Sequence, residues 1–140
     1  MTRVRILLAD DHPAVLDRVV QLLSPEYEIV GAVRDGQTLV DVALTAKPDL
    51  LIVDVSMPII NGIEAASRLT RAGLQMGIIF LTVHDSPDYV SATQDAGALG
   101  YVIKASMTKD LREAIRNVLE GKQFISPSLG RSPIEKKRPY

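Results

Sequence analysis

Short runs of apolar and β-branched residues alternate along this chain with longer segments of helical period. The runs occupy residues 4–9, 28–33, 50–53, 78–82 and 101–103, and several are apolar at every position. Strands that are apolar on both faces are typical of a parallel sheet covered by helices on both sides. The pattern therefore predicts five buried strands, each followed by a helix.

The helical segments have recognisable starts and apolar stripes. Pro13 suits the first turn of the first helix, and Asp35, Gly62 and the Ser86-Pro87 pair mark the starts of the next three. In the last helix, one stripe recurs at positions three and four apart and comprises Leu111, Ala114, Ile115, Val118 and Leu119. The fourth helix has a thinner apolar stripe, formed by Tyr89, Val90, Ala92 and Ala96.

Five strands that alternate with five helices predict an α/β fold. Parallel neighbours need right-handed crossover helices, so we expect a doubly wound, five-stranded parallel sheet of flavodoxin-like type with strand order 2-1-3-4-5 and helices on both faces. The pattern ends after Gly121, where Pro, Ser and Gly become frequent. We expect residues 1–121 to form one domain and residues 122–140 to form a linker or tail.

The composition is that of a globular domain. The 140 residues suffice for one ordinary domain, and 46% of them are hydrophobic. The apolar runs end far short of the ~18 residues that a membrane span needs. The chain has no cysteine, which excludes disulfides and thiolate metal sites. A cytoplasmic protein that does not contact a membrane is the expectation.

Charge is divided unevenly along the chain. The first 120 residues carry 11 Lys or Arg and 16 Asp or Glu, whereas the last 20 carry five and one. A basic tail can contact nucleic acid or an acidic partner, but charge spread this thinly is more typical of a solvated linker. We therefore interpret the tail as a basic linker.

Five polar residues lie at the ends of the predicted strands. Asp10 and Asp11 follow the first strand, Asp54 the third and Lys104 the fifth, and Thr82 ends the fourth. Ligands of an open parallel sheet bind at this edge. Three carboxylates there would repel one another and raise their pKa values unless a cation offsets the charge. Oxygen ligands without a His or Cys cluster favour Mg²⁺.

A carboxylate beside Mg²⁺ is suited to phosphoryl transfer, because the metal neutralises charge on the transferred group. Asp54 would then form an acyl phosphate. Thr82 would offer a hydroxyl and Lys104 an ammonium to the phosphoryl oxygens. These residues predict a phosphoacceptor, not an enzyme that turns over substrate.

In order and spacing, these motifs resemble the receiver domain of two-component response regulators. They are Asp10-Asp11, Asp54-Val55-Ser56-Met57-Pro58 with Gly62, Thr82, and Gly100-Tyr101-Val102-Ile103-Lys104, and the similarity covers roughly residues 3 to 120. Any one motif is weak, but the joint match is specific. Three stretches are further similar to the NarL/FixJ subfamily of transcriptional regulators: residues 8–13, 81–85 and 104–106.

The resemblance implies a role for each site residue. Asp54 is the phosphorylation site, and Mg²⁺ is held by Asp10, Asp11, Asp54 and the backbone carbonyl of Ser56. Thr82 and Tyr101 form a switch pair, in which Thr82 moves toward the phosphoryl group and Tyr101 turns inward. The thin stripe of the fourth helix favours such a rearrangement, because less burial makes local movement cheaper.

The resemblance also implies partners. A sensor histidine kinase donates the phosphoryl group, and the face of the fourth helix, fifth strand and fifth helix switches to control an output. A homodimer would use that face or the face of the first and fifth helices. DNA would be bound through an output domain after the linker. Because the chain ends at Tyr140, we expect that domain to be absent here, either by truncation or because the receiver acts alone.

Some residues depart from the family pattern or have plainer interpretations. Ala105 replaces the Pro that commonly follows the family's lysine, so the geometry of the Lys104–Ala105 peptide stays open. His12 and His84 have no metal-ligand spacing and are interpreted as solvated loop residues, although His84 is placed to tune the lifetime of an acyl phosphate. The Met57-Pro58 pair and Gly62 suggest loop geometry, with a positive φ at the glycine.

Two other functions stay open. One is a binding module of the same fold that pairs constitutively through its last helices without phosphorylation; the intact acidic, Thr and Lys residues argue against it. The other is a Mg²⁺-dependent phosphohydrolase with Asp54 as nucleophile, but a haloacid-dehalogenase-like enzyme would need an Asp where Ser56 stands. A flavodoxin is disfavoured, because the loop after the first strand is acidic.

Overall fold

The computed structural model describes residues 3–83 and 87–127, so that His84 and Ser86 lie outside the described residues. The strands are β1 (Arg5–Ala9), β2 (Glu28–Val33), β3 (Leu50–Asp54), β4 (Gly77–Thr82), β5 (Gly100–Ile103) and β6 (Phe124–Ile125). The helices are α1 (Pro13–Leu23), α2 (Gly36–Ala46), α3 (Gly62–Arg71), α4 (Pro87–Asp95) and α5 (Met107–Leu119), with a 3-10 turn, η1 (Lys104–Ser106), before α5.

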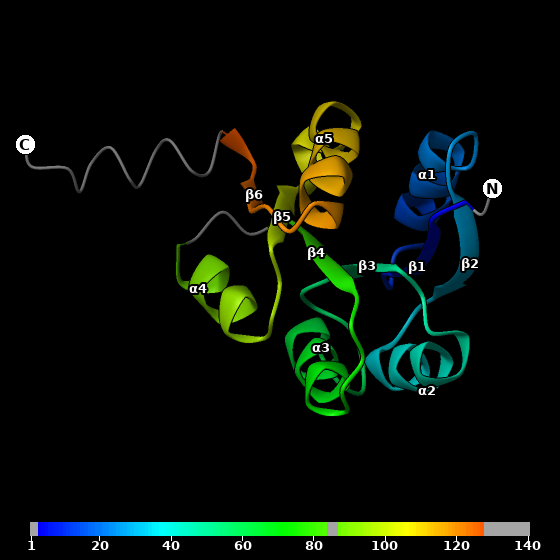
Figure 1. The fold of residues 1–140 in the computed structure, drawn as a ribbon, viewed down its shortest axis with the longest axis vertical. Coiled ribbons are helices and arrows are strands. Elements are labelled where there is room, and N and C mark those ends of the chain that lie inside the picture. The colour runs from blue at the N-terminus through cyan, green and yellow to red at the C-terminus, as the bar shows by residue number, and fades with distance from the viewer. Residues whose placement is uncertain (1–2, 84–86, 128–140) are drawn as a thin grey trace, which may run out of the picture.

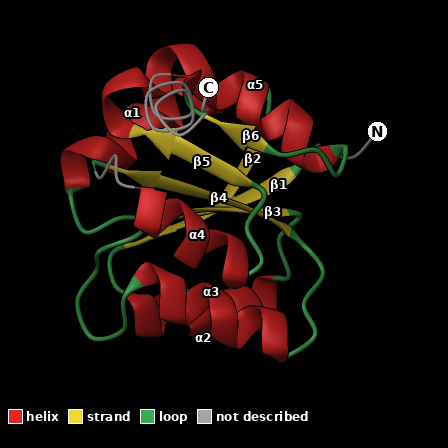
Figure 2. Ribbon diagram, turned by 90° about the vertical axis from the view of Figure 1, so that its left-hand side faces the viewer, coloured by secondary structure: helices red, strands yellow, loops and turns green. Residues whose placement is uncertain are grey.

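The strands form one parallel sheet in the order β2-β1-β3-β4-β5-β6. Helices α1 and α5 cover one face, and α2, α3 and α4 cover the other (Figures 1 and 2). The predicted doubly wound, flavodoxin-like fold is therefore confirmed, with its first five strands in the predicted order 2-1-3-4-5. Within the described residues, no helix is long and apolar enough to cross a bilayer.

The sixth strand differs from the prediction of five. It pairs with β5 through Gly100↔Phe124 and Tyr101↔Ile125, beyond the point at which the sequence pattern was taken to end. Two residues are too few to show an alternation of apolar and polar positions. The sheet therefore extends into the segment that was predicted to be a linker.

The continuous apolar runs result from burial on both faces. All five residues of β3 are buried. Its side chains alternate, because successive strand residues point to opposite faces. Leu50 and Ile52 enter the cluster under α1 and α5, whereas Leu51 and Val53 enter the cluster under α2, α3 and α4. The sheet is thus the shared wall of two cores.

The helices begin where their capping residues predict. The Asp35 side chain caps α2 by accepting a hydrogen bond from Thr38 N at 2.8 Å, and Asn61 caps α3 by accepting one from Glu64 N at 2.8 Å. Such caps satisfy backbone donors that have no partner within the helix. Each cap also fixes where the preceding loop leaves the sheet edge.

Candidate functional site

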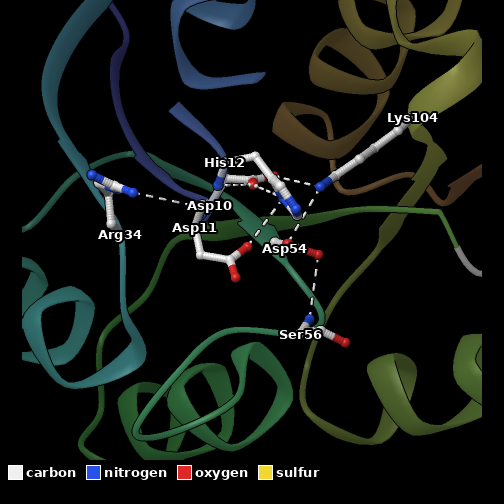
Figure 3. A network of polar contacts seen from close by, with 7 residues as sticks. All are labelled: Asp10, Asp11, His12, Arg34, Asp54, Ser56 and Lys104. Carbon is white, nitrogen blue, oxygen red and sulfur yellow. Dashed lines mark hydrogen bonds and ion pairs between the residues drawn. The ribbon is translucent and has the colours of Figure 1, made fainter. Parts of the chain in front are cut away.

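The predicted site residues lie together at the carboxyl edge of the sheet. Asp10 follows β1, Asp54 is the last residue of β3, Thr82 is the last of β4, and Lys104 opens η1 after β5. Figure 3 shows the side chains of Asp10, Asp11, Asp54 and Lys104 directed toward one another. Parallel strands end at the same edge, which is why residues so far apart in sequence meet here.

The carboxylates are crowded and largely shielded from solvent. Asp10 is 2% exposed and Asp54 is 4% exposed, and Thr82 is fully buried. One oxygen from each of Asp10, Asp11 and Asp54 lies within 4.8 Å of the others, and a ring nitrogen of His12 joins this group. Buried carboxylates at such separations are unfavourable unless positive charge compensates them.

Lys104 supplies part of that positive charge. Its Nζ lies 2.8 Å from Asp10 Oδ2 and 3.3 Å from Asp54 Oδ2. The peptide between Lys104 and Ala105 is trans, which answers the question that the missing proline had left open. A flexible ammonium in this position can pair with carboxylate or with phosphoryl oxygens.

The compensation is incomplete at Asp54. Burial raises the pKa of the Asp54 carboxyl above its usual range, and the neighbouring Asp10 carboxylate raises it further. The Lys104 ammonium and the Ser56 N–H, which donates to Asp54 Oδ1 at 3.3 Å, act in the opposite direction without cancelling the rise. The site is therefore electrostatically short of positive charge.

The residues fit a divalent cation. Among the described residues, Asp10 Oδ2 and Asp11 Oδ1 are buried side-chain oxygens that accept no hydrogen bond, although each has a charged or ring nitrogen nearby. These two oxygens can lie close to a nitrogen and still accept no hydrogen bond, because a hydrogen bond requires suitable angles as well as a short distance. Oxygens of this kind are what a hard cation requires as ligands.

His12 is part of the site, which the sequence interpretation missed. Its side chain is 64% exposed, as a solvated loop residue would be, yet its Nδ1 lies 3.1 Å from both Asp10 Oδ1 and Asp11 Oδ1. Its backbone N–H also donates to Asp10 Oδ1 at 2.9 Å. His12 is also the N-cap residue of α1. Adjacency to Asp11 was the available signal.

The loop after β3 has a different geometry from the one expected. A Cβ at Gly62 would lie 1.9 Å from the carbonyl oxygen of Asp54, so the glycine is required by close backbone approach. Gly62 has no positive φ; the left-handed residue of this loop is Ile59, with φ 72° and a side chain 78% exposed. The expectation of a positive φ at Gly62 was therefore wrong.

Tyr101 is already buried in this structure, and Ser56 lies beside Asp54. Tyr101 is 2% exposed and belongs to the cluster under α2, α3 and α4. Ser56 follows Asp54 by two residues, with its backbone beside that carboxylate (Figure 3). The switching of Tyr101 and metal ligation by the Ser56 carbonyl stay predictions.

Comparison with known proteins supports the same fold and family. A family model described as the response regulator receiver domain matches residues 6–116. The transcriptional regulatory protein DesR of Bacillus subtilis is 37% identical over 128 residues, which are 90% of this chain and 63% of DesR. DegU of Brevibacillus brevis, also a transcriptional regulatory protein, is 30% identical over 97% of this chain and 58% of its own length.

Solved structures agree. A two-component response regulator of the LuxR family from Aurantimonas sp. SI85-9A1 has a TM-score of 0.89 at 29% identity and covers 98% of this chain and 99% of its own. The isolated receiver domain of RcsB from Salmonella enterica serovar Typhimurium, with the phosphomimetic BeF3⁻, has a TM-score of 0.84 at 30% identity over 93% of this chain and 98% of its own.

The family match covers residues 6–116, and the relatives are longer than this chain. The chain spans about three fifths of the length of DegU and DesR. The matched residues include every aspartate of the site as well as Thr82 and Lys104. The chain belongs to the response-regulator receiver family, and its relatives are regulators of the NarL/LuxR type.

Proposed function

We propose that this receiver accepts a phosphoryl group on Asp54 from a phosphohistidine of a sensor kinase, with Mg²⁺ held by Asp10, Asp11, Asp54 and the Ser56 carbonyl. The observation that carries the proposal is the Asp54 carboxylate itself. It is 4% exposed, has a raised pKa, and lies beside two further aspartates and 3.3 Å from Lys104 Nζ.

The proposed transfer balances without a further reactant. A carboxylate oxygen of Asp54 forms a bond to phosphorus while the bond from phosphorus to the donor imidazole nitrogen breaks. That nitrogen keeps the electron pair, and the donor ring, protonated on its other nitrogen, leaves as neutral imidazole. Lys104 then pairs with the phosphoryl oxygens instead of the carboxylates, and Thr82 donates a hydrogen bond from its hydroxyl. When bound, Mg²⁺ neutralises charge on the transferred group.

The output side of the proposal concerns the face formed by α4, β5 and α5. Thr82 moves toward the phosphoryl group, and the buried position that Tyr101 already has here is the one that this movement favours, which alters the face. Homodimerisation is proposed through the same face or through α1 and α5. Control of transcription is proposed through a DNA-binding domain outside the described residues, since the matched relatives are regulators of transcription and exceed this chain in length.

Intact mass spectrometry tests the proposal. The wild type, incubated with acetyl phosphate and Mg²⁺, is expected to gain one phosphoryl group, and excess chelator is expected to prevent the gain. Asp54→Asn is expected to gain none. Asp41→Asn, which changes an exposed aspartate on α2, is the matched control and is expected to behave like the wild type.

Other outcomes point to the other functions. Failure of the wild type to take up a phosphoryl group from acetyl phosphate or from any kinase would overturn the proposal in favour of a phosphorylation-independent binding module. Many turnovers of acetyl phosphate per protein would favour a phosphohydrolase. Uptake that survives Asp54→Asn would place the acceptor elsewhere.

A further inference from the structure

A second buried polar pair lies outside the acidic site. Asp110, in the first turn of α5, is 3% exposed, and Ser126, directly after β6, is fully buried. The Ser126 hydroxyl donates a hydrogen bond to Asp110 Oδ2 at 2.9 Å. A buried carboxylate is costly to maintain, and the phosphoryl-transfer chemistry makes no use of this one. We therefore expect the contacts of Asp110 and Ser126 to have a role separate from phosphoryl transfer.

Ser126 connects both ends of the segment that bears Lys104. Its hydroxyl accepts a hydrogen bond from Ile103 N at 3.0 Å and donates to Asp110, so one side chain spans residues 103–110. Its backbone N–H donates to Tyr101 O at 2.9 Å. Lys104 follows Ile103 directly, and Tyr101 is the proposed switch residue. We name the contact of Ser126 with Ile103 and Asp110 the clasp.

The strand before the clasp is held on both faces of the sheet. Phe124 is 7% exposed and lies in the cluster under α1 and α5, whereas Ile125 packs against the opposite cluster, which contains Tyr101. Phe124 N donates to Leu99 O at 2.9 Å. The chain after α5 is thus docked along β5, beside both residues that are expected to respond to phosphorylation.

From this arrangement we propose that Ser126 and Asp110 are positioning residues that couple the segment after α5 to the state of the phosphorylation site. The proposal rests on phosphorylation of Asp54. When Lys104 leaves Asp10 and Asp54 for the phosphoryl oxygens, the 103–110 segment shifts, the clasp opens and β6 is released. The closed clasp, in turn, holds Lys104 in the position that it has without the phosphoryl group.

Thermodynamic reciprocity distinguishes a clasp that is coupled to the phosphorylation site from one that only stabilises the fold. If the phosphorylated state favours an open clasp, then opening the clasp by mutation favours the phosphorylated state by the same factor. A pair that only stabilises the fold would lower the free energy of unfolding without changing affinity at the acidic site. Affinity for a phosphoryl analogue therefore separates the two roles.

Hydrogen exchange measured by mass spectrometry gives the first test, on the full chain with Mg²⁺ and with or without beryllofluoride. In the wild type, beryllofluoride is expected to speed exchange in peptides covering residues 122–127 by about fivefold or more. In Ser126→Ala these peptides are expected to exchange fast under both conditions. Unchanged exchange at 122–127 in a wild type that binds beryllofluoride would overturn the clasp while leaving phosphorylation of Asp54 intact.

Beryllofluoride affinity, measured by titration calorimetry, gives the second test. Ser126→Ala is expected to bind about fivefold more tightly than the wild type. Asp110→Asn retains a carbonyl acceptor for the Ser126 hydroxyl and is therefore expected to bind beryllofluoride about as tightly as the wild type does. Thr38→Val is the matched control, since its hydroxyl also donates to an aspartate, Asp35 Oδ2 at 2.9 Å, on α2 and away from Lys104 and from the proposed output face.

The two tests distinguish coupling from a purely structural pair, from a general loss of stability and from failure of the proposed function. Equal affinities of folded Ser126→Ala and wild type would show a structural pair without coupling and would overturn the proposal. Tighter binding by Thr38→Val as well would show a general effect of lost stability and would overturn it too. A wild type that takes up neither phosphoryl nor beryllofluoride would overturn the proposed function first, and the coupling with it.

Discussion

The two helices that flank β5 are held to the sheet in different ways. Helix α5 packs on β4, β5 and β6 and buries a full stripe, comprising Met107, Asp110, Leu111, Ala114, Ile115 and Val118. In α4, Thr93 is buried, but Tyr89 and Val90 are only partly buried. The lesson is that α4 costs less free energy to rearrange than α5, so movement of α5 is expected only in its first turn, where the clasp lies.

The largest expected effect tests this contrast directly. Leu111 is fully buried, so Leu111→Ala is expected to lower the free energy of unfolding by about 3 kcal/mol through lost burial and a cavity. Val90→Ala on α4 is expected to cost less than about 1 kcal/mol, because that side chain is only partly buried. Urea denaturation measures both, and equal losses would contradict the contrast.

A second prediction sharpens the contrast without mutation. Amides of α4 are expected to exchange with a protection free energy about 2 kcal/mol below that of α5, because fewer buried contacts must break for α4 to open. Exchange followed by NMR on the unphosphorylated protein measures this difference. Equal protection of the two helices would mean that α4 opens only with the whole domain.

The acidic site at the carboxyl edge of the sheet is expected to oppose stability. Asp54 has a raised pKa, so the folded protein binds its proton more tightly than the unfolded chain does. Its contribution is favourable below the unfolded pKa of about 3.9 and is lost as pH rises through the higher folded value. At pH 7 in metal-free buffer, Asp54→Asn is therefore expected to raise the free energy of unfolding.

Urea denaturation in metal-free buffer checks the sign of this effect. It is measured between about pH 4 and about pH 8, the range in which the Asp54 carboxyl is expected to release its proton. The gain from Asp54→Asn should shrink toward acid pH, where the wild-type carboxyl is protonated. Adding Mg²⁺ should stabilise the wild type more than the variant. A variant that is less stable than the wild type at neutral pH would show that the Lys104 contact outweighs burial.

The smallest expected effect concerns the outer surface of α5. Arg112 pairs with Glu26 at 2.7 Å and donates to Leu22 O at 2.8 Å, but the paired side chains are 41% and 55% exposed. Arg112→Ala is therefore expected to cost about 0.5 kcal/mol, less at high salt. A loss as large as that of Leu111→Ala would mean that surface charge, not the buried stripe, holds α5.

The sequence predicted those features that depend on local pattern. The strands β1, β3, β4 and β5 were evident because both of their faces are largely buried, and the partly exposed β2 was evident from its short β-branched run. The meeting of Asp10, Asp54 and Lys104 followed from the shared edge of parallel strands. Strand β6 was not evident, because its two residues show no period and only docking against β5 defines it. The contact of His12 with the carboxylates depends on loop geometry, for which the sequence offers only the adjacency of His12 to Asp11.

Residues far apart in sequence set the limit of such predictions. Ser126 and Asp110 carry no motif, and their contact exists only once β6 lies along β5. The need for glycine at position 62 was assigned to φ, whereas the actual cause is the carbonyl of Asp54, eight residues earlier. In both cases the sequence does not show which backbone segments lie against each other: β6 along β5 in the first case, and Gly62 against Asp54 in the second.

The outer strands limit how copies of this protein can associate. Strand β2 is partly exposed along its length, and its ladder with β1 is irregular between Ile6 and Leu7. At the opposite border, β6 offers only two residues. Short or irregular borders give a neighbouring molecule little backbone with which to form a continuous intermolecular ladder. Fibre-like growth through strand addition is therefore disfavoured, which leaves helical surfaces for self-association.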